Sequence, residues 1–150
     1  FDSHGELINL TNLENYVNIA RKNPKTTFAL WSKRFDLIKK FFDNNEKPSN
    51  LILIYSNPTL NKPLKKLPKY FDKTFNNVVK LSYKNYYNQN TMFFQKNEIT
   101  KELKAKIKND YETYKNNFDK DNNINCFQKC KDCLLCYTFN NVQTIIEKVK

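Results

Sequence analysis

The sequence alternates between stretches with the apolar spacing of helices and short apolar runs with the composition of strands. Residues 9–24, NLTNLENYVNIARKNP, place apolar side chains at helical spacing, with Thr11 as a candidate N-cap. Residues 26–33, TTFALWSK, are rich in residues that favour strands, and residues 34–45 return to helical spacing. The run LILIYS, residues 51–56, is typical of a strand that is buried on both faces.

This alternation predicts an α/β fold with a parallel sheet and right-handed crossover helices. The residues before the first helix are also typical of the end of a strand. In parallel α/β folds the functional loops gather at the carboxyl ends of the strands. Here we expect those ends at Ser3 to Glu6, at Ser32 and Lys33, and at Ser56 and Asn57.

The second half of the chain carries a weaker pattern. Residues 77–83, NVVKLSY, indicate a fourth strand, and residues 86–96 have the aromatic, Asn-rich composition of a loop. A stripe of apolar residues predicts a long helix over 97–118. The last residues, 140–150, are predicted to form a short amphipathic helix.

The net charge of +11 and the isoelectric point near 9.4 would favour polyanionic partners, so nucleic acid bound through the basic surface is an alternative to an unknown substrate. Lysines scattered through Asn-rich loops are equally typical of a surface that is merely solvated. No apolar run reaches the length of a membrane helix, and no signal sequence opens the chain. We therefore expect a cytoplasmic protein without a membrane partner.

The segment NCFQKCKDCLLCY, residues 125–137, contains every cysteine of the chain: Cys126, Cys130, Cys133 and Cys136. Disulfides suit neither the expected compartment nor such close spacing, because two bridges in one small loop would be strained. Chance clustering is improbable in a chain that has no other cysteine. The pattern therefore predicts that these four thiols bind a metal centre.

The spacing of the cysteines favours a [4Fe-4S] cluster over zinc, which stays the alternative. Structural zinc sites usually join two cysteine pairs that lie a dozen or more residues apart. The run Cys130-x2-Cys133-x2-Cys136 instead resembles the loops by which ferredoxins hold a cubane, with Cys126 available as a fourth ligand. Ferredoxins, however, usually take the fourth cysteine from elsewhere in the chain. A cluster bound in the ferredoxin manner would therefore leave one of these four thiols free.

A second interpretation of the motif comes from radical S-adenosylmethionine (SAM) enzymes. They hold their cluster through the spacing of Cys126-x3-Cys130-x2-Cys133, which would leave Cys136 over. In those enzymes the cluster loop follows the first strand, whereas this segment lies beyond the last strand that we expect. A fourth thiolate would also block the iron that binds SAM, so we interpret the site as an auxiliary cluster.

Three segments together are similar to the gene product 88 family of phage and mobile-element proteins, which resembles radical SAM barrels. They are FDSHGELINLTNLENYVNIARKNPKTTFALWSKRFDLI, KPSNLILIYSNPTLN and NCFQKCKDCLLCYTFNNVQTIIEKVK. The resemblance implies part of a radical-SAM-like barrel, followed by a Cys-rich segment that binds the cluster. It further implies two regions: a barrel-like α/β domain over residues 1–120, and a four-cysteine tail over 121–150 packed on the same domain.

The resemblance also implies cofactor contacts near the N-terminus. In the radical SAM superfamily a Gly-Glu pair at a strand end contacts the amino group of SAM, and Gly5 and Glu6 stand at a similar place. His4 beside them would face the same pocket as an acid, base or ligand, although a surface turn explains it equally well. The cysteine region that would carry the family's first cluster is absent, so we expect either a part of a longer protein or a degenerate copy. SAM is implied only with an upstream segment, and neither the reaction nor catalytic residues are predicted.

Overall fold

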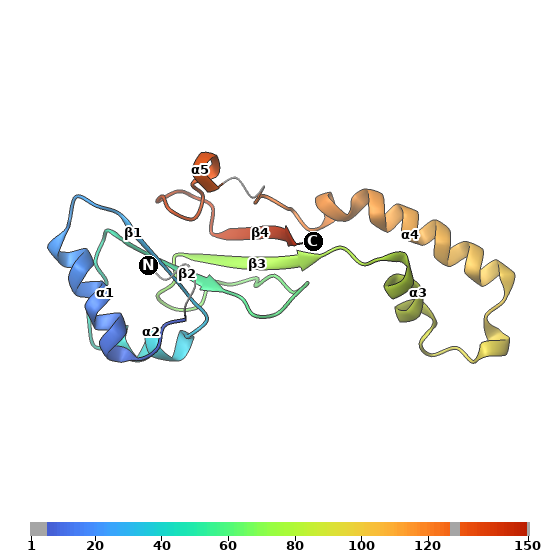
Figure 1. Cartoon of the computed structure of the whole chain (residues 1–150), viewed down its shortest axis with the longest axis horizontal. Helices are drawn as coiled ribbons and strands as arrows, with labels where there is room; N and C mark the ends of the chain where they lie inside the picture. Colours follow the sequence, from blue (N-terminus) through green and yellow to red (C-terminus); the bar gives the residue numbers. More distant parts are fainter. Residues whose placement is uncertain (1–5, 127–129, 150) are drawn as a thin grey trace.

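The computed structural model describes residues 6–126 and 130–149 (Figure 1). These residues form a mixed α/β structure, in which helices and parallel strands alternate in the first half of the chain. The elements are α1 (Leu10–Lys22), β1 (Phe28–Ser32), α2 (Phe35–Phe42), β2 (Leu51–Ser56), β3 (Lys73–Val79), α3 (Tyr83–Thr91), the 3-10 helix η1 (Lys96–Glu98), α4 (Lys101–Asp121), α5 (Cys130–Cys133) and β4 (Thr144–Val149).

The four strands form one parallel sheet in the order β1-β2-β3-β4. The sheet is strongly staggered, because the first residue of β3, Lys73, lies opposite Ile54 near the end of β2. Strand β4 then pairs with β3 over nearly its whole length. The predicted parallel α/β architecture is confirmed. The four-stranded sheet does not test whether the chain is part of a barrel, so the barrel stays a prediction. The division into regions 1–120 and 121–150 also stays a prediction.

The two faces of the sheet bury different partners because successive strand residues point to opposite sides. Leu51 and Leu53 pack in one core with the apolar faces of α1 and α2. Ile52 and Ile54 pack on the other face, in a core that includes Cys136. In Figure 1, α5 accordingly lies on the opposite side of the sheet from α1 and α2. The cysteine segment therefore covers the sheet face that these helices leave open.

Helix α1 begins before the position predicted from its sequence. The side chain of Asn9 is the N-cap, and its Oδ1 accepts a hydrogen bond from the Asn12 amide at 2.8 Å. Thr11 consequently lies inside the first turn, and its predicted capping role is wrong. The apolar stripe itself is as expected, since Leu13, Val17 and Ala20 are buried.

Helices α3 and α4 form an arm, residues 83–121, which extends away from the sheet beyond the end of β3 (Figure 1). The predicted loop at 86–96 is wrong over α3, whose N-cap is Ser82. Aromatic rings hold the two helices together, including Tyr86 packed against Tyr114 at 5.1 Å between ring centroids. Helix α4 confirms the predicted long helix. No described helix is long and apolar enough to cross a bilayer.

Strand β4 occupies residues that we expected to form a helix. The apolar positions Val142, Ile145, Ile146 and Val149 have helical spacing, which suggested that element. In the structure, Ile145 and Ile146 are both buried, on opposite faces of a strand paired with β3. The predicted helix is therefore wrong, because pairing with a long neighbouring strand outweighs the local pattern. The cysteine segment precedes a strand, rather than lying beyond the last one as expected.

Candidate metal centre

Two separate parts of the fold supply the four cysteines. Cys126 forms a parallel β-bridge with Glu147, and its amide donates to the Ile146 carbonyl at 3.1 Å, so it is attached to the outer edge of β4. Cys130 and Cys133 are the two ends of α5, and Cys136 follows in the next turn. The sequence offered Cys126 as a fourth ligand without placing it in an element of the fold. The structure places Cys126 on the sheet edge.

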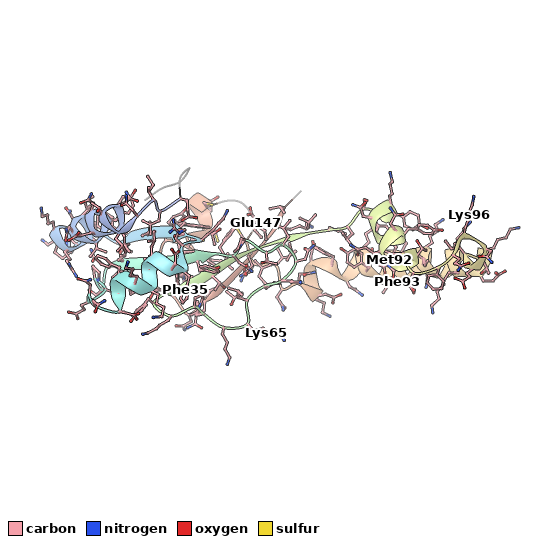
Figure 2. All side chains as sticks on the ribbon, turned by 90° about the horizontal axis from the view of Figure 1, so that it is seen from below. Phe35, Lys65, Met92, Phe93, Lys96 and Glu147 are labelled. Carbon is pink, nitrogen blue, oxygen red and sulfur yellow. The ribbon has the colours of Figure 1, made fainter. Side chains whose placement is uncertain are left out.

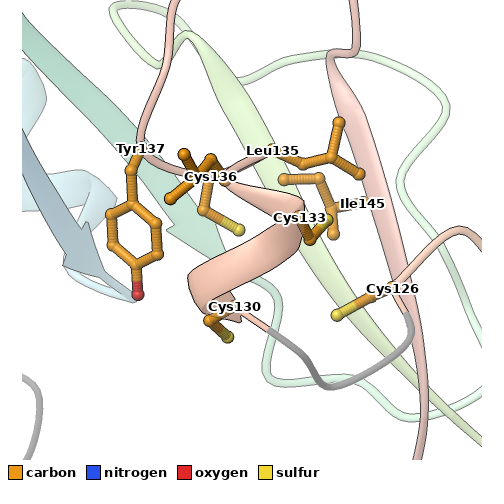
Figure 3. A pocket seen from close by; sticks show the side chains of 8 residues that line it. Cys126, Cys130, Cys133, Leu135, Cys136, Tyr137 and Ile145 are labelled. Atoms are coloured by element: carbon orange, nitrogen blue, oxygen red, sulfur yellow. The ribbon is translucent and has the colours of Figure 1, made fainter.

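The four cysteines line a single pocket, which Figure 3 shows from close by. Its other walls are Leu134, Leu135, Tyr137 and Ile145. Leu134 adopts a left-handed conformation with φ of 52°, and its carbonyl accepts from the Tyr137 amide at 3.0 Å. This tight turn reverses the chain after α5. The turn places Cys136 in the same pocket as Cys130 and Cys133 of α5.

Burial differs sharply among the thiols. Cys136 is 8% exposed, whereas Cys130 at the start of α5 is exposed. Burial raises the pKa of the Cys136 thiol to about 12, and the neighbouring cysteines add to this rise. The metal-free pocket therefore holds Cys136 as a neutral thiol. In the described part of the chain, no three metal-binding side chains are close enough to hold a single ion.

A buried lysine, which the sequence analysis did not single out, supports the loop that follows Cys133. The Nζ of Lys73 donates hydrogen bonds to the Leu135 carbonyl at 2.6 Å and to Asn140 Oδ1 at 2.7 Å. Lys73 stands at the start of β3, and the residue is 2% exposed. An apolar residue is the usual occupant of such a position. The basic, otherwise ordinary sequence around Lys73 gave no sign of this role.

Glu6 lies beside the carboxyl end of β1, and the earlier strand that we expected before it falls on residues outside the described part of the chain. Its Oε1 accepts from Ser32 Oγ at 2.7 Å, and its Oε2 accepts from the Lys33 amide at 3.0 Å. Two of the strand-end segments named above are thus brought together. Glu6 does not line the cysteine pocket. His4 and Gly5 lie outside the described residues.

The third strand end belongs to a buried amide network. Asn57 Nδ2 donates to Asn76 Oδ1 at 2.9 Å, and Asn76 is fully buried within β3. Asn76 Nδ2 in turn donates to Thr74 Oγ1 at 3.1 Å. These polar atoms satisfy one another, which explains their burial without a ligand.

Comparison with protein families gives one match. The model of the family described as "Gene product 88" matches residues 3–141, which include Glu6 and all four cysteines. Comparisons with curated proteins and with solved structures found no match.

Proposed function

This chain belongs to the gene product 88 family, and we propose that it is an iron–sulfur protein that binds a [4Fe-4S] cluster through its four cysteines. The observation that carries the proposal is that Cys126, Cys130, Cys133 and Cys136 line one pocket although they come from two parts of the fold. Four thiolates are the usual ligand set of such clusters. The pocket walls are largely apolar, which limits the access of water to a bound centre.

The elements that carry the four cysteines favour a cluster over a single zinc ion. Zinc sites of four cysteines are typically built from two short pairs, each forming its own knuckle. Here α5 and the turn after it carry three thiols in succession, and the edge of β4 adds the fourth. A cubane has four iron corners, so it takes ligands spread around a pocket. When bound, the cluster would supply one-electron chemistry.

The proposal is tested by the metal content of protein purified under anaerobic conditions. We expect about four irons and four sulfides per chain, with the broad visible absorption of iron–thiolate centres. The variant Cys133→Ser should lose most of this iron, whereas Tyr137→Phe, which alters a pocket wall without removing a thiol, should keep it. Stoichiometric zinc without sulfide would overturn the cluster and establish the alternative, a zinc-binding module.

We also propose that the sheet is part of a radical-SAM-like barrel. The four strands run parallel in sequential order, and α1 and α2 cover one face, which is the arrangement of one sector of an α/β barrel. The cysteine segment then covers the face that points inward in such barrels. This position suits an auxiliary cluster. A role for Glu6 towards SAM belongs to the same proposal and is tested separately below.

A second candidate function, binding of single-stranded nucleic acid, is favoured by the arm. The turn after α3 exposes three apolar residues in succession, Met92, Phe93 and Phe94, and Phe93 is 88% exposed. Figure 2 shows Met92 and Phe93 on this arm, away from the sheet, with Lys96 farther out towards its tip. Residues 83–108 contain six lysines and two glutamates. Exposed rings among positive charges are suited to stacking bases while the lysines contact phosphates.

Fluorescence anisotropy with an oligothymidine strand tests this second function. Binding should weaken steeply as salt rises, and Phe93→Ser should weaken it at least about tenfold. Ile8→Ser is the matched control, because Ile8 is 73% exposed but lies outside the arm. No binding by the unmodified chain at low salt, or equal losses in both variants, would remove this candidate.

A further inference from the structure

Lys73 is a buried cation without a carboxylate partner among the described residues. Its Nζ donates hydrogen bonds to the carbonyls of Leu135 and Val142 and to the amide oxygen of Asn140. All three acceptors are neutral. The carboxylate of the adjacent Asp72 pairs instead with Lys47 Nζ at 2.6 Å.

Such a position is costly unless a negative charge compensates the ammonium. Removing a charge from water is unfavourable, and hydrogen bonds to neutral oxygens recover only part of that loss. The Lys73 ammonium donates to the carbonyl of Leu135, the residue directly before Cys136, so it lies beside the cysteine turn. Cysteine side chains become thiolates when they bind a metal, so they are the groups that acquire negative charge in this core.

The acceptors of Lys73 all lie in the segment that follows Cys133. Leu135 lies directly before Cys136, and Asn140 and Val142 lie directly before β4. Asn140 tightens the same segment, because its Oδ1 also accepts from the Val142 amide at 2.9 Å and its Nδ2 donates to the Leu135 carbonyl at 3.2 Å. One ammonium thus joins both ends of the loop to the start of β3.

We infer that Lys73 is a positioning residue for the cysteine centre: it fixes the loop 135–142 before the metal binds and supplies the positive charge that offsets the thiolates of the bound cluster. The inference rests on the proposed function for its second half only. The first half concerns the metal-free chain. A positive charge beside the cluster stabilises the reduced form, which carries one more electron, and so raises the reduction potential.

The test compares Lys73→Met, Lys73→Arg and Lys47→Met. Lys47 is the control: it is half-buried rather than buried, and its ammonium is also hydrogen-bonded but pairs with a carboxylate. In metal-free protein, amide hydrogen exchange of residues 134–142 should be at least about tenfold faster in Lys73→Met than in the unmodified chain. After cluster reconstitution, Lys73→Met should shift the midpoint potential to more negative values. Lys73→Arg should stay near the original potential, and Lys47→Met should leave both readings unchanged.

Asn140→Ala provides a second route if Lys73→Met does not fold, because Asn140 is exposed and its loss leaves Lys73 Nζ with the Leu135 and Val142 carbonyls as acceptors. It should also speed exchange of the loop. Unchanged exchange in the folded Lys73 variant, or in Asn140→Ala if that variant must be used, would overturn the positioning role. Faster exchange with an unchanged potential would overturn the electrostatic role. If the unmodified chain takes up no cluster, the proposed function fails, the electrostatic half fails with it, and the exchange data alone decide the positioning role.

Discussion

Cys126 pairs with Glu147 in a parallel β-bridge, which fixes the first cysteine to the strand that closes the described chain. The other three cysteines are carried by α5 and the turn after it. Formation of the pocket therefore depends on the pairing of β4, even though the four cysteines are close neighbours in the sequence. Folding of the sheet edge and formation of the cysteine pocket are thus coupled in this structure.

The reactivity of the cysteines in metal-free protein should follow their burial. Cys130 is exposed and should react fastest with iodoacetamide, whereas Cys136 should react slowest. With its pKa raised to about 12, Cys136 is a thiolate in only about one molecule in ten thousand at pH 8. Its alkylation should accelerate as pH rises towards that value, provided the chain stays folded. Mass spectrometry of peptides from timed reactions measures each rate, and equal rates at Cys130 and Cys136 would contradict the described burial.

Two buried isoleucines on opposite faces of the sheet should separate stability from metal binding. Ile145→Ala and Ile38→Ala each remove a fully buried side chain, and each should cost about 2–5 kcal/mol in the free energy of unfolding. Only Ile145 lines the cysteine pocket. We expect iron retention to fall in Ile145→Ala and to persist in Ile38→Ala under conditions where both are folded. Urea unfolding with iron analysis provides both readings, and equal iron loss would assign the effect to stability alone.

Glu6 should prove necessary for the junction between the N-terminal segment and β1. Glu6→Gln replaces one carboxylate oxygen with a donor that faces either Ser32 Oγ or the Lys33 amide, and should cost about 0.5–1.5 kcal/mol because Glu6 is itself exposed. Glu14→Gln on α1 is the exposed control. Calorimetric titration of cluster-loaded protein with SAM tests the cofactor role implied by the resemblance. Weaker binding in Glu6→Gln than in the control supports that role, whereas equal binding, or none to the unmodified chain, removes it.

The base of the arm depends on two tyrosine hydroxyls. Tyr114 Oη accepts from the Leu81 amide at 2.9 Å, and Tyr111 Oη donates to the Leu81 carbonyl at 3.3 Å. Tyr114→Leu should therefore speed hydrogen exchange across α3 and α4 while β1 and β2 keep their protection. Lys115→Ala, at an exposed neighbouring position, should change neither. Uniform acceleration over the whole chain would show instead that the arm and the sheet unfold together.

The sequence predicted those elements whose pattern and packing agree. The sequence pattern of α1, α2 and β2 agrees with the way these elements pack. The apolar stripes of the two helices and the apolar run of β2 are buried in the fold, so the prediction of these elements is confirmed. Helix α3 was missed because YKNYYNQNT has weak helix propensity. Its stability comes from rings on α4, as in the contact of Tyr83 with Tyr111 at 5.2 Å. Strand β4 was missed because its apolar residues have helical spacing and because its partner β3 is distant in sequence.

The candidate metal centre could also be predicted only in part from the sequence. The four cysteines were evident from their clustering alone. The hydrogen bonds of Glu6 to the end of β1 were not, because the sequence suggested an earlier strand before Glu6. Lys73 was not evident, because a lysine in a lysine-rich chain becomes distinctive only when the fold buries it beneath a loop more than sixty residues away. The pairing of Cys126 with Glu147 could not be predicted either, because it requires strand β4, and the helical spacing of these residues suggested a helix instead.

The Mössbauer spectrum of protein reconstituted with ⁵⁷Fe and sulfide under anaerobic conditions is the best test of the proposed [4Fe-4S] cluster held by four thiolates. We expect the signal of a cubane in which all irons are cysteine-ligated, and the loss of this signal in Cys136→Ser. A spectrum of mononuclear iron–thiolate alone, or iron that is washed away while zinc binds stoichiometrically, would contradict it.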